Sequence, residues 1–373
     1  MAEATIASNR TQQGKTVLQS TRNVNDTDST ETALLLGIDL GTSRSSIVSL
    51  DGKRKTVESY VGYPKDPVSR KHLKADVVFG KHALDNRLSL DMFRPLEAGV
   101  IKGSGEGEWS DELSRRNLGA AKDLLAHLVD EIEPGRDEVL YGVIGVPSRA
   151  STKNKQAILE IAKEVLDSVM IVSEPFTVAY GLGRMADVIV IDIGAGTTDL
   201  CRMHGTVPGD EDEVSYTIAG DAIDQKMFEL IMTKYPAAQL TVNMCKTFKE
   251  KYGFVHDAKD KIEVLIPVNG KPTPHDITDE VRGACSILIA PCVEGIVKLV
   301  SSFNPEFQDR IKNNIVLSGG GGQMDGLGKK IEDNLGQIGG GKVTVVEEPL
   351  YAGANGALQL AVDMPTEYWQ QLR

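Results

Sequence analysis

The sequence predicts an α/β fold built from two similar halves, in which buried sheets are flanked by helices. Strands and helices alternate along most of the chain. An apolar strand that ends on aspartate and turns through glycine and hydroxyl residues occurs twice, at Asp39 and at Asp192. The chain has 373 residues, a length that suits roughly two domains of about 150 residues each.

The composition is that of a soluble globular protein. Hydrophobic residues make up 41%, charged residues 25%, and the formal net charge is −12. An acidic chain is a poor match for a nucleic-acid protein that works by neutralising phosphates, although it can still bind a single nucleotide. No apolar run approaches the roughly 18 residues of a membrane span, and no secretory signal begins the chain. We therefore expect a cytoplasmic protein without a transmembrane segment.

Neither the cysteines nor the N-terminal segment points to chemistry. The four cysteines form no CxxC pair, and Cys285 and Cys292 are expected to be buried core thiols. The six histidines are scattered, so no zinc site is predicted. Residues 1–32 are polar and lack apolar periodicity, which predicts a disordered tail; a docking arm is the alternative.

The first half follows a regular order after residue 33. An apolar strand ends in the turn Asp39-Leu40-Gly41-Thr42-Ser43 and is followed by a hairpin strand at 46–50. Residues 64–107 are irregular and indicate a small inserted subdomain. Apolar periodicity then predicts a helix at 113–132, a strand at 139–147, a helix at 151–166, a strand at 170–172 and a helix capped by Ser173.

The second half repeats this plan. A strand at 188–193 runs into the second glycine turn, and a helix follows at 222–234. The region 240–283 holds a helix at 242–252 and two strands. A long apolar helix is expected at 284–302, then a strand at 314–318 that runs into a glycine-rich loop, and a helix at 353–362.

Three glycine-bearing turns predict a site for a nucleoside triphosphate. Glycine lets the backbone approach an anion closely, and successive N–H groups of such a turn can bind phosphate. The Walker pattern is absent, so two facing hairpin turns would close on the phosphates, and the third turn would lie against the base and ribose. The residues assigned to nucleotide binding are Asp39, Gly41, Thr42, Ser43, Gly194, Ala195, Gly196, Thr197, Thr198, Gly220, Asp221, Gly319, Gly320 and Gly321.

Aspartates and a glutamate supply the predicted chemistry. Mg²⁺ keeps most of its waters and uses few carboxylates, so Asp39 and Asp192 are expected to hold it through water. Neither turn carries a lysine, which leaves charge neutralisation mainly to the metal and the backbone N–H groups. Glu174, at a strand-to-helix junction, is the candidate that orients the attacking water. The alternative for Glu174 is a structural role as a first-turn glutamate favoured by the helix dipole. Asp221 and Asp224 are likewise either contacts to the ribose or between domains, or simple helix-start charges.

These strings resemble the superfamily of actin, Hsp70 and sugar-kinase ATPases over about residues 33–365. The string 190–199 resembles the second phosphate loop of bacterial actins, 315–321 their adenosine loop, and 248–252 the segment whose Lys249-Glu250 pair touches adenosine. Within bacterial actins, the resemblance is to the magnetosome-associated ones of magnetotactic bacteria. It rests on the strings at residues 62–66, 143–147, 172–176, 205–209 and 367–372.

The resemblance implies a two-lobed actin-like fold in which each lobe has a five-stranded sheet and a small inserted subdomain. The implied boundaries are 33–63, 108–180 and 350–373 for subdomain IA, 64–107 for IB, 181–222 and 284–349 for IIA, and 223–283 for IIB. It places Glu174 where the family has its water-activating residue and Asp192 where it has a metal-linked catalytic aspartate. Arg44 and the longer tail depart from the family pattern.

The resemblance also implies a function and its partners. The chain would polymerise with ATP and Mg²⁺, hydrolyse ATP to ADP in cytoskeletal filaments, and position magnetosomes near their membranes. Its partners would be further copies of itself and magnetosome-associated connector proteins, and not nucleic acid. The alternatives are a filament for cell shape or plasmid segregation, a non-polymerising scaffold or Hsp70-like ATPase, and a sugar kinase, for which no catalytic aspartate can be assigned.

Overall fold

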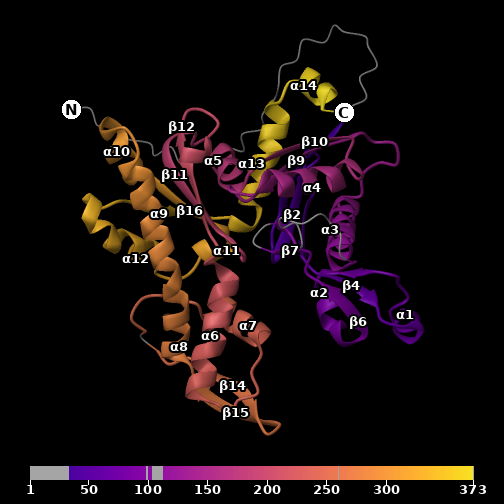
Figure 1. The fold of residues 1–373 in the computed structure, drawn as a ribbon, viewed down its shortest axis with the longest axis vertical. Helices are drawn as coiled ribbons and strands as arrows, with labels where there is room; N and C mark the ends of the chain where they lie inside the picture. Colours follow the sequence, from indigo (N-terminus) through magenta and orange to yellow (C-terminus); the bar gives the residue numbers. More distant parts are fainter. Residues whose placement is uncertain (1–32, 98–99, 103–111, 259, 373) are drawn as a thin grey trace, which may run out of the picture. The chain divides into compact units, whose positions relative to one another are not determined.

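The computed structural model describes residues 33–97, 100–102, 112–258 and 260–372, and the predicted tail 1–32 lies outside them. Two five-stranded sheets share one topology, with the strand orders β10-β9-β1-β2-β3 and β13-β12-β11-β16-β17 (Figure 1). In each sheet the central strand, β1 or β11, pairs antiparallel with the next strand of the chain and parallel with a later one. The predicted α/β fold of two similar halves is confirmed.

We call the part that contains the first sheet lobe I. Its sheet consists of β1 (Leu34–Leu40), β2 (Arg44–Ser49), β3 (Arg54–Glu58), β9 (Leu140–Val146) and β10 (Ser168–Ser173). Its helices are α3 (Glu112–Asp130), α4 (Thr152–Lys163), α5 (Glu174–Gly181), α13 (Pro349–Asp363) and α14 (Thr366–Gln371). The inserted arm of lobe I comprises β4 (Val61–Pro64), α1 (Pro67–Leu73), β5 (Val78–Phe79), α2 (Gly80–Asp85), η1 (Arg87–Ser89), β6 (Leu90–Phe93), β7 (Leu96–Glu97) and β8 (Val100–Ile101).

Lobe II contains the second sheet and a second inserted arm. Its sheet consists of β11 (Ala186–Ile193), β12 (Thr198–His204), β13 (Glu213–Tyr216), β16 (Ile315–Ser318) and β17 (Val343–Val345). Around it lie η2 (Asp210–Asp212), η3 (Ser286–Leu288), α9 (Ile289–Ser301), α10 (Pro305–Lys312), α11 (Gly319–Gly322), α12 (Leu327–Asn334) and η4 (Leu335–Ile338). The arm comprises α6 (Gly220–Lys234), α7 (Val242–Tyr252), β14 (Glu263–Val268), β15 (Lys271–Asp276) and α8 (Thr278–Cys285).

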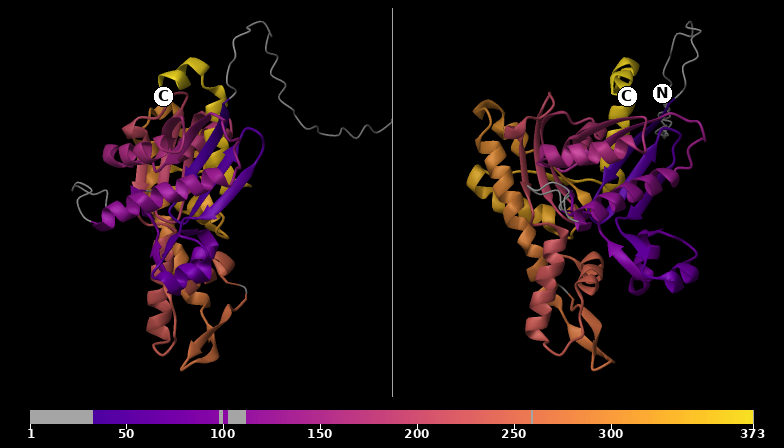
Figure 2. Two further views of the ribbon diagram at one scale, coloured as in Figure 1. Left: turned by 90° about the vertical axis from the view of Figure 1, so that its right-hand side faces the viewer. Right: turned by 45° about the vertical axis from the view of Figure 1, so that its right-hand side comes forward.

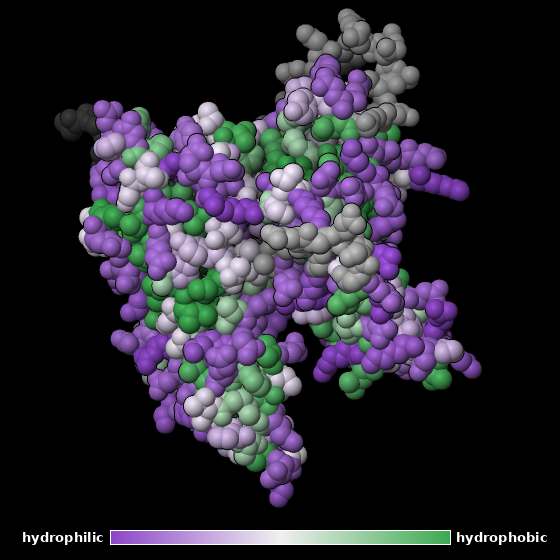
Figure 3. All heavy atoms as spheres, in the orientation of Figure 1, coloured by the Kyte–Doolittle hydropathy of each residue, from purple (hydrophilic) through white to green (hydrophobic). Residues whose placement is uncertain are grey.

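The two inserted arms extend from the same end of the lobes. In all views the indigo arm of lobe I and the orange arm of lobe II lie away from α14, which is yellow (Figures 1 and 2). A hollow separates the two arms in the space-filling view, where hydrophilic and hydrophobic residues are interspersed over the face that is drawn (Figure 3).

Helices α5 and α13 pack against each other between the two sheets. Their apolar residues share one core with β9, β11 and β12. Glycines bring the two helices into backbone contact, since a Cβ built on Gly356 would lie 1.7 Å from the Thr177 carbonyl oxygen. Helix α5 begins at Glu174, so this contact fixes the position of the predicted water-orienting residue.

We expect Gly356→Ala to destabilise the protein by about 1–3 kcal/mol, because an extra methyl group would force α5 and α13 apart. Gly119, which is exposed in α3, is the matched control, because nothing lies within 4 Å of a Cβ built there. Gly119→Ala should stabilise the helix by up to about 1 kcal/mol. Thermal unfolding of both variants measures the difference; equal melting temperatures would contradict the close packing.

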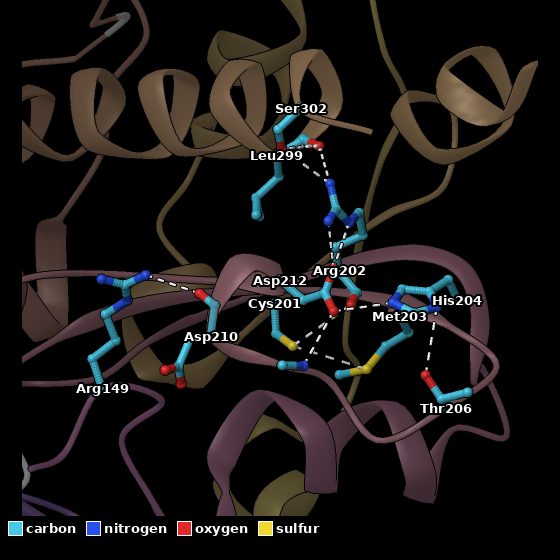
Figure 4. Close-up of polar contacts among 11 residues, drawn as sticks. Arg149, Cys201, Arg202, Met203, His204, Thr206, Asp210, Asp212, Leu299 and Ser302 are labelled. Carbon is cyan, nitrogen blue, oxygen red and sulfur yellow. Dashed lines mark hydrogen bonds and ion pairs between the residues drawn. The ribbon is translucent and has the colours of Figure 1, made fainter. Parts of the chain in front are cut away.

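A buried ion-pair cluster holds the loop between β12 and β13 (Figure 4). The Arg202 guanidinium donates to Asp212 Oδ1 at 2.8 Å and to the Leu299 carbonyl at 2.7 Å. His204 Nε2 lies 3.0 Å from Asp212 Oδ2. From lobe I, Arg149 donates to the carbonyl of Asp210 in the same loop at 2.9 Å. The cluster therefore fixes the far end of β12, whose other end adjoins the second glycine turn.

The expectation that no apolar segment is long enough to span a membrane is wrong by length and composition. The helical stretch Thr278–Ser301, which joins α8, η3 and α9, is long and apolar enough to cross a membrane. Its side chains nevertheless line the core of lobe II, where Val281, Cys285, Cys292 and Ile296 are fully buried. We therefore interpret it as a core helix. Cys285 and Cys292 are buried and free, as predicted for core thiols, and Cys201 and Cys245 are buried and free as well.

Candidate functional site

A cavity of about 510 Å³ gathers the predicted turns. This volume is within the range of small-molecule sites. The predicted residues that line it are Asp39, Gly41, Thr42, Ser43, Glu174, Asp192, Gly194, Ala195, Gly196, Thr197, Gly220, Asp221, Lys249, Glu250, Gly319, Gly320 and Gly321. The fold thus brings residues from six separate segments of the chain to one place.

Thr198 is the exception among the predicted site residues. It is the buried first residue of β12, and its hydroxyl donates to the Ile218 carbonyl at 2.8 Å. Because that hydroxyl is directed to the neighbouring backbone, Thr198 supports the turn from behind and does not line the cavity.

Asp39 and Asp192 occupy equivalent positions at the ends of β1 and β11. In the sheet ladders, Asp39 pairs with Ser46 of β2, and Asp192 pairs with Asp199 of β12. Both residues are partly buried and line the cavity. Burial raises the pKa of Asp39 to about 6, and burial together with the charges of Asp39 and Asp199 raises the pKa of Asp192 to about 7. Facing carboxylates that repel each other are a site where a cation is favourable.

The glycine-rich run after β16 forms the short helix α11, where the sequence predicted a loop. Gly319 has φ 74°, and a Cβ there would lie 2.4 Å from the Ile193 carbonyl oxygen. A Cβ on Gly321 would lie 2.3 Å from Ile193 Cγ2. Only glycine fits at these two positions, and the close approach holds the third turn directly against the strand that carries the second turn.

Glu174 is the first residue of α5 and lines the cavity while 8% exposed. Burial and the charges of Asp39, Asp192 and Asp199 raise the pKa of its carboxyl well above the ordinary value. Ser173 stands at the N-cap, but its side chain makes no capping hydrogen bond, contrary to the prediction. A strongly shifted pKa in a cleft marks Glu174 as a candidate for proton transfer.

Helix α7 adds two cations to the cavity, of which sequence reasoning identified only Lys249. Lys246, Lys249 and Glu250 all line the cavity from one face of α7. Lys249 Nζ donates to the Gly220 carbonyl at 2.7 Å and pairs with Asp224 at 2.8 Å. The spacing of three residues between the lysines was the available signal for Lys246. Side-chain cations therefore join the backbone N–H groups in offsetting negative charge.

The raised pKa values predict a pH dependence of stability in the nucleotide-free protein. The folded state keeps protons on Asp39, Asp192 and Asp224 that the unfolded chain releases near pH 3.8. Their contribution is therefore full below about pH 3.8 and is lost as pH rises through 6 to 7. We expect Asp192→Asn to stabilise the protein, relative to wild type, by on the order of 1–2 kcal/mol more at pH 7.5 than at pH 4.5. Melting temperatures at the two pH values measure this, and an equal difference at both would contradict it.

Comparisons with known proteins agree with this geometry. The model of the MreB/Mbl protein family matches residues 34–367. The chain is 41% identical over 339 residues to the actin-like protein MamK of Paramagnetospirillum magneticum, covering 91% of the chain and 95% of that protein. It is 40% identical to MamK of Magnetospirillum gryphiswaldense, covering 91% of the chain and 92% of that protein.

Solved structures give the same result. The chain matches a MamK double helical filament with a TM-score of 0.85 at 40% identity, covering 89% of the chain and 100% of that structure. It matches a non-polymerising MamK mutant bound to AMPPNP with a TM-score of 0.68, at the same identity and coverage. An MreB of Spiroplasma citri bound to ADP shares the fold with a TM-score of 0.71. The two chains are 21% identical, and the match covers 87% of this chain and 95% of that structure. The chain therefore belongs to the MamK actin-like proteins of the MreB/Mbl family.

Proposed function

We propose that the chain is an ATP-dependent, filament-forming bacterial actin that hydrolyses ATP to control the turnover of its filaments. The proposal rests on one observation. Asp39 and Asp192, with the glycine turns that follow them, line one cavity together with Glu174. Relatives at about 40% identity include a protein solved as a filament and one solved with the ATP analogue AMPPNP, which supports both parts of the proposal.

The residues divide the work between binding and hydrolysis. The backbone N–H groups of the first two turns bind the phosphates, and α11 with the Lys249-Glu250 pair lies against the adenosine. Asp39 and Asp192 would hold Mg²⁺, which would supply charge neutralisation on the phosphate oxygens. Glu174 accepts a hydrogen bond from the attacking water and orients it toward the γ-phosphate.

For the cellular role, we propose a cytoplasmic track that aligns and positions magnetosomes. The similarity to two MamK proteins at 40–41% identity, and the resemblance of several strings to magnetosome-associated actins, support this cargo. The partners would be further copies of this chain and connector proteins on magnetosome membranes. A filament that serves cell shape or plasmid segregation is the alternative, because the residues of the cavity do not indicate which cargo the filament carries.

Sedimentation with electron microscopy tests assembly. The purified chain at micromolar concentration with ATP and Mg²⁺ should enter the pellet as filaments and release phosphate. The same sample with Mg²⁺ but no nucleotide should stay in the supernatant. Hydrolysis without sedimentation would favour a non-polymerising Hsp70-like ATPase, and stimulation of hydrolysis by a sugar would favour a kinase.

A further inference from the structure

Arg94, which follows β6 in the arm of lobe I, connects that arm to lobe II. Its Nε donates to the Thr42 carbonyl of the first turn at 2.8 Å. Its Nη2 lies 3.0 Å and 2.9 Å from the two carboxylate oxygens of Asp221, at the start of α6. The side chains of Arg94 and Asp221 are 23% and 38% exposed, so this ion pair is partly shielded from water. Asp221, predicted to bind the nucleotide, thus has its carboxylate paired with an arginine.

Lys246 makes a second contact between the two lobes, and here the donor belongs to lobe II and the acceptor to lobe I. It extends from α7 of lobe II, and its Nζ donates to Ser43 Oγ of the first turn at 2.6 Å. The ring of Tyr60 lies 5.8 Å from the Arg94 guanidinium and 6.0 Å from Lys246 Nζ, within cation–π range of both. Burial, with the neighbouring charges of Arg94 and Lys249, lowers the pKa of Lys246.

The two contacts join elements that must separate if the cavity is to open. Thr42, Ser43 and Tyr60 belong to lobe I, whereas Asp221 and Lys246 belong to the arm of lobe II. Ser43, Asp221 and Lys246 line the cavity, so the contacts lie at its wall. The arms beyond them stand apart across a hollow (Figure 3). Movement of the arms away from each other would break both contacts together.

We propose that the Arg94–Asp221 and Lys246–Ser43 contacts form a gate that limits how fast nucleotide enters and leaves the cavity. This inference rests on the proposed nucleotide-binding function. A gate differs from a ligand contact in its kinetics. It slows passage in both directions, whereas a residue that only binds the nucleotide slows release and leaves association nearly unchanged.

The test is stopped-flow binding of a fluorescent ADP analogue to the full-length protein, kept below its assembly concentration. In Arg94→Gln, we expect the association and release rate constants both to rise about 10-fold, with the dissociation constant changed by less than about 2-fold. Arg94→Lys, which keeps the charge but loses the two-point contact, should give intermediate rates.

Arg87→Gln is the control from the same arm, because Arg87 is exposed and donates to the Leu84 carbonyl within that arm. It should leave both rates unchanged. A rise in release alone, with an equal rise in the dissociation constant, would show that Arg94 is a ligand contact and would overturn the gate. Unchanged rates in Arg94→Gln would overturn it as well. If the wild-type chain binds no ADP analogue, the proposed function itself fails, which is a different result from binding with unaltered exchange.

Discussion

Glu174→Gln is expected to lower the rate of ATP hydrolysis by about 10²- to 10⁴-fold, the usual contribution of a positioned general base. Glutamine keeps the size of the side chain and its place at the start of α5, but it cannot accept the proton of the attacking water. The buried carboxyl, whose pKa is raised by burial and by three nearby aspartates, is also replaced by a neutral group. Binding of ATP and assembly of filaments should therefore persist, and the filaments should disassemble slowly.

Phosphate release and sedimentation, measured together, separate these effects. Glu160→Gln is the matched control, because Glu160 is exposed on α4 and lies outside the cavity lining; it should hydrolyse ATP as wild type does. Hydrolysis at the wild-type rate in Glu174→Gln would leave Glu174 with only the helix-dipole role. Loss of assembly in the same variant would show that hydrolysis, and not ATP binding, drives polymerisation.

Sequence reasoning located the parts of the site that recur as strings. Asp39 and Asp192 were recognisable because the same strand–aspartate–glycine turn occurs twice, and the two sheets that carry them share one topology. Glu174 was a candidate because it lies between a strand and a helix, a position that equally suits a first-turn glutamate, and the resemblance to actins favoured the site role. Each of these signals lies within one short stretch of sequence, so it can be recognised without knowing which segments the fold brings together.

Contacts between distant segments were not predictable in the same way. Arg94 and Asp221 are 127 positions apart, and no pattern in either segment refers to the other. The sequence did indicate a partner for Arg202, because a charged residue inside an apolar strand such as β12 is rarely buried unless it is paired. It did not indicate which residue that partner is, since Asp212 lies in the following loop. The gate and the cluster in lobe II therefore emerge only from the fold.

Gly319→Ala is expected to disrupt nucleotide binding and the folding of lobe II together. A methyl group at Gly319 meets the Ile193 carbonyl oxygen at 2.4 Å in a left-handed conformation, so both the backbone angle and the packing oppose it. We expect a loss of about 2–5 kcal/mol in stability. Ile193 directly precedes Gly194, so displacing it also moves the second turn. The ATP affinity should fall by about 100-fold or more, which corresponds to about 2.7 kcal/mol.

The adjacent glycine separates the two causes of this loss. Gly320 also lines the cavity, but its φ is not positive and nothing lies within 4 Å of a Cβ built there. Without nucleotide, Gly320→Ala should melt within about 2 °C of wild type, while Gly319→Ala melts far lower. If Gly320→Ala nevertheless weakens binding of a fluorescent ATP analogue, its methyl group occupies space that the nucleotide needs, which places the adenosine against α11. Wild-type stability and affinity in Gly319→Ala would mean that α11 and the second turn are not held together by the contact with Ile193.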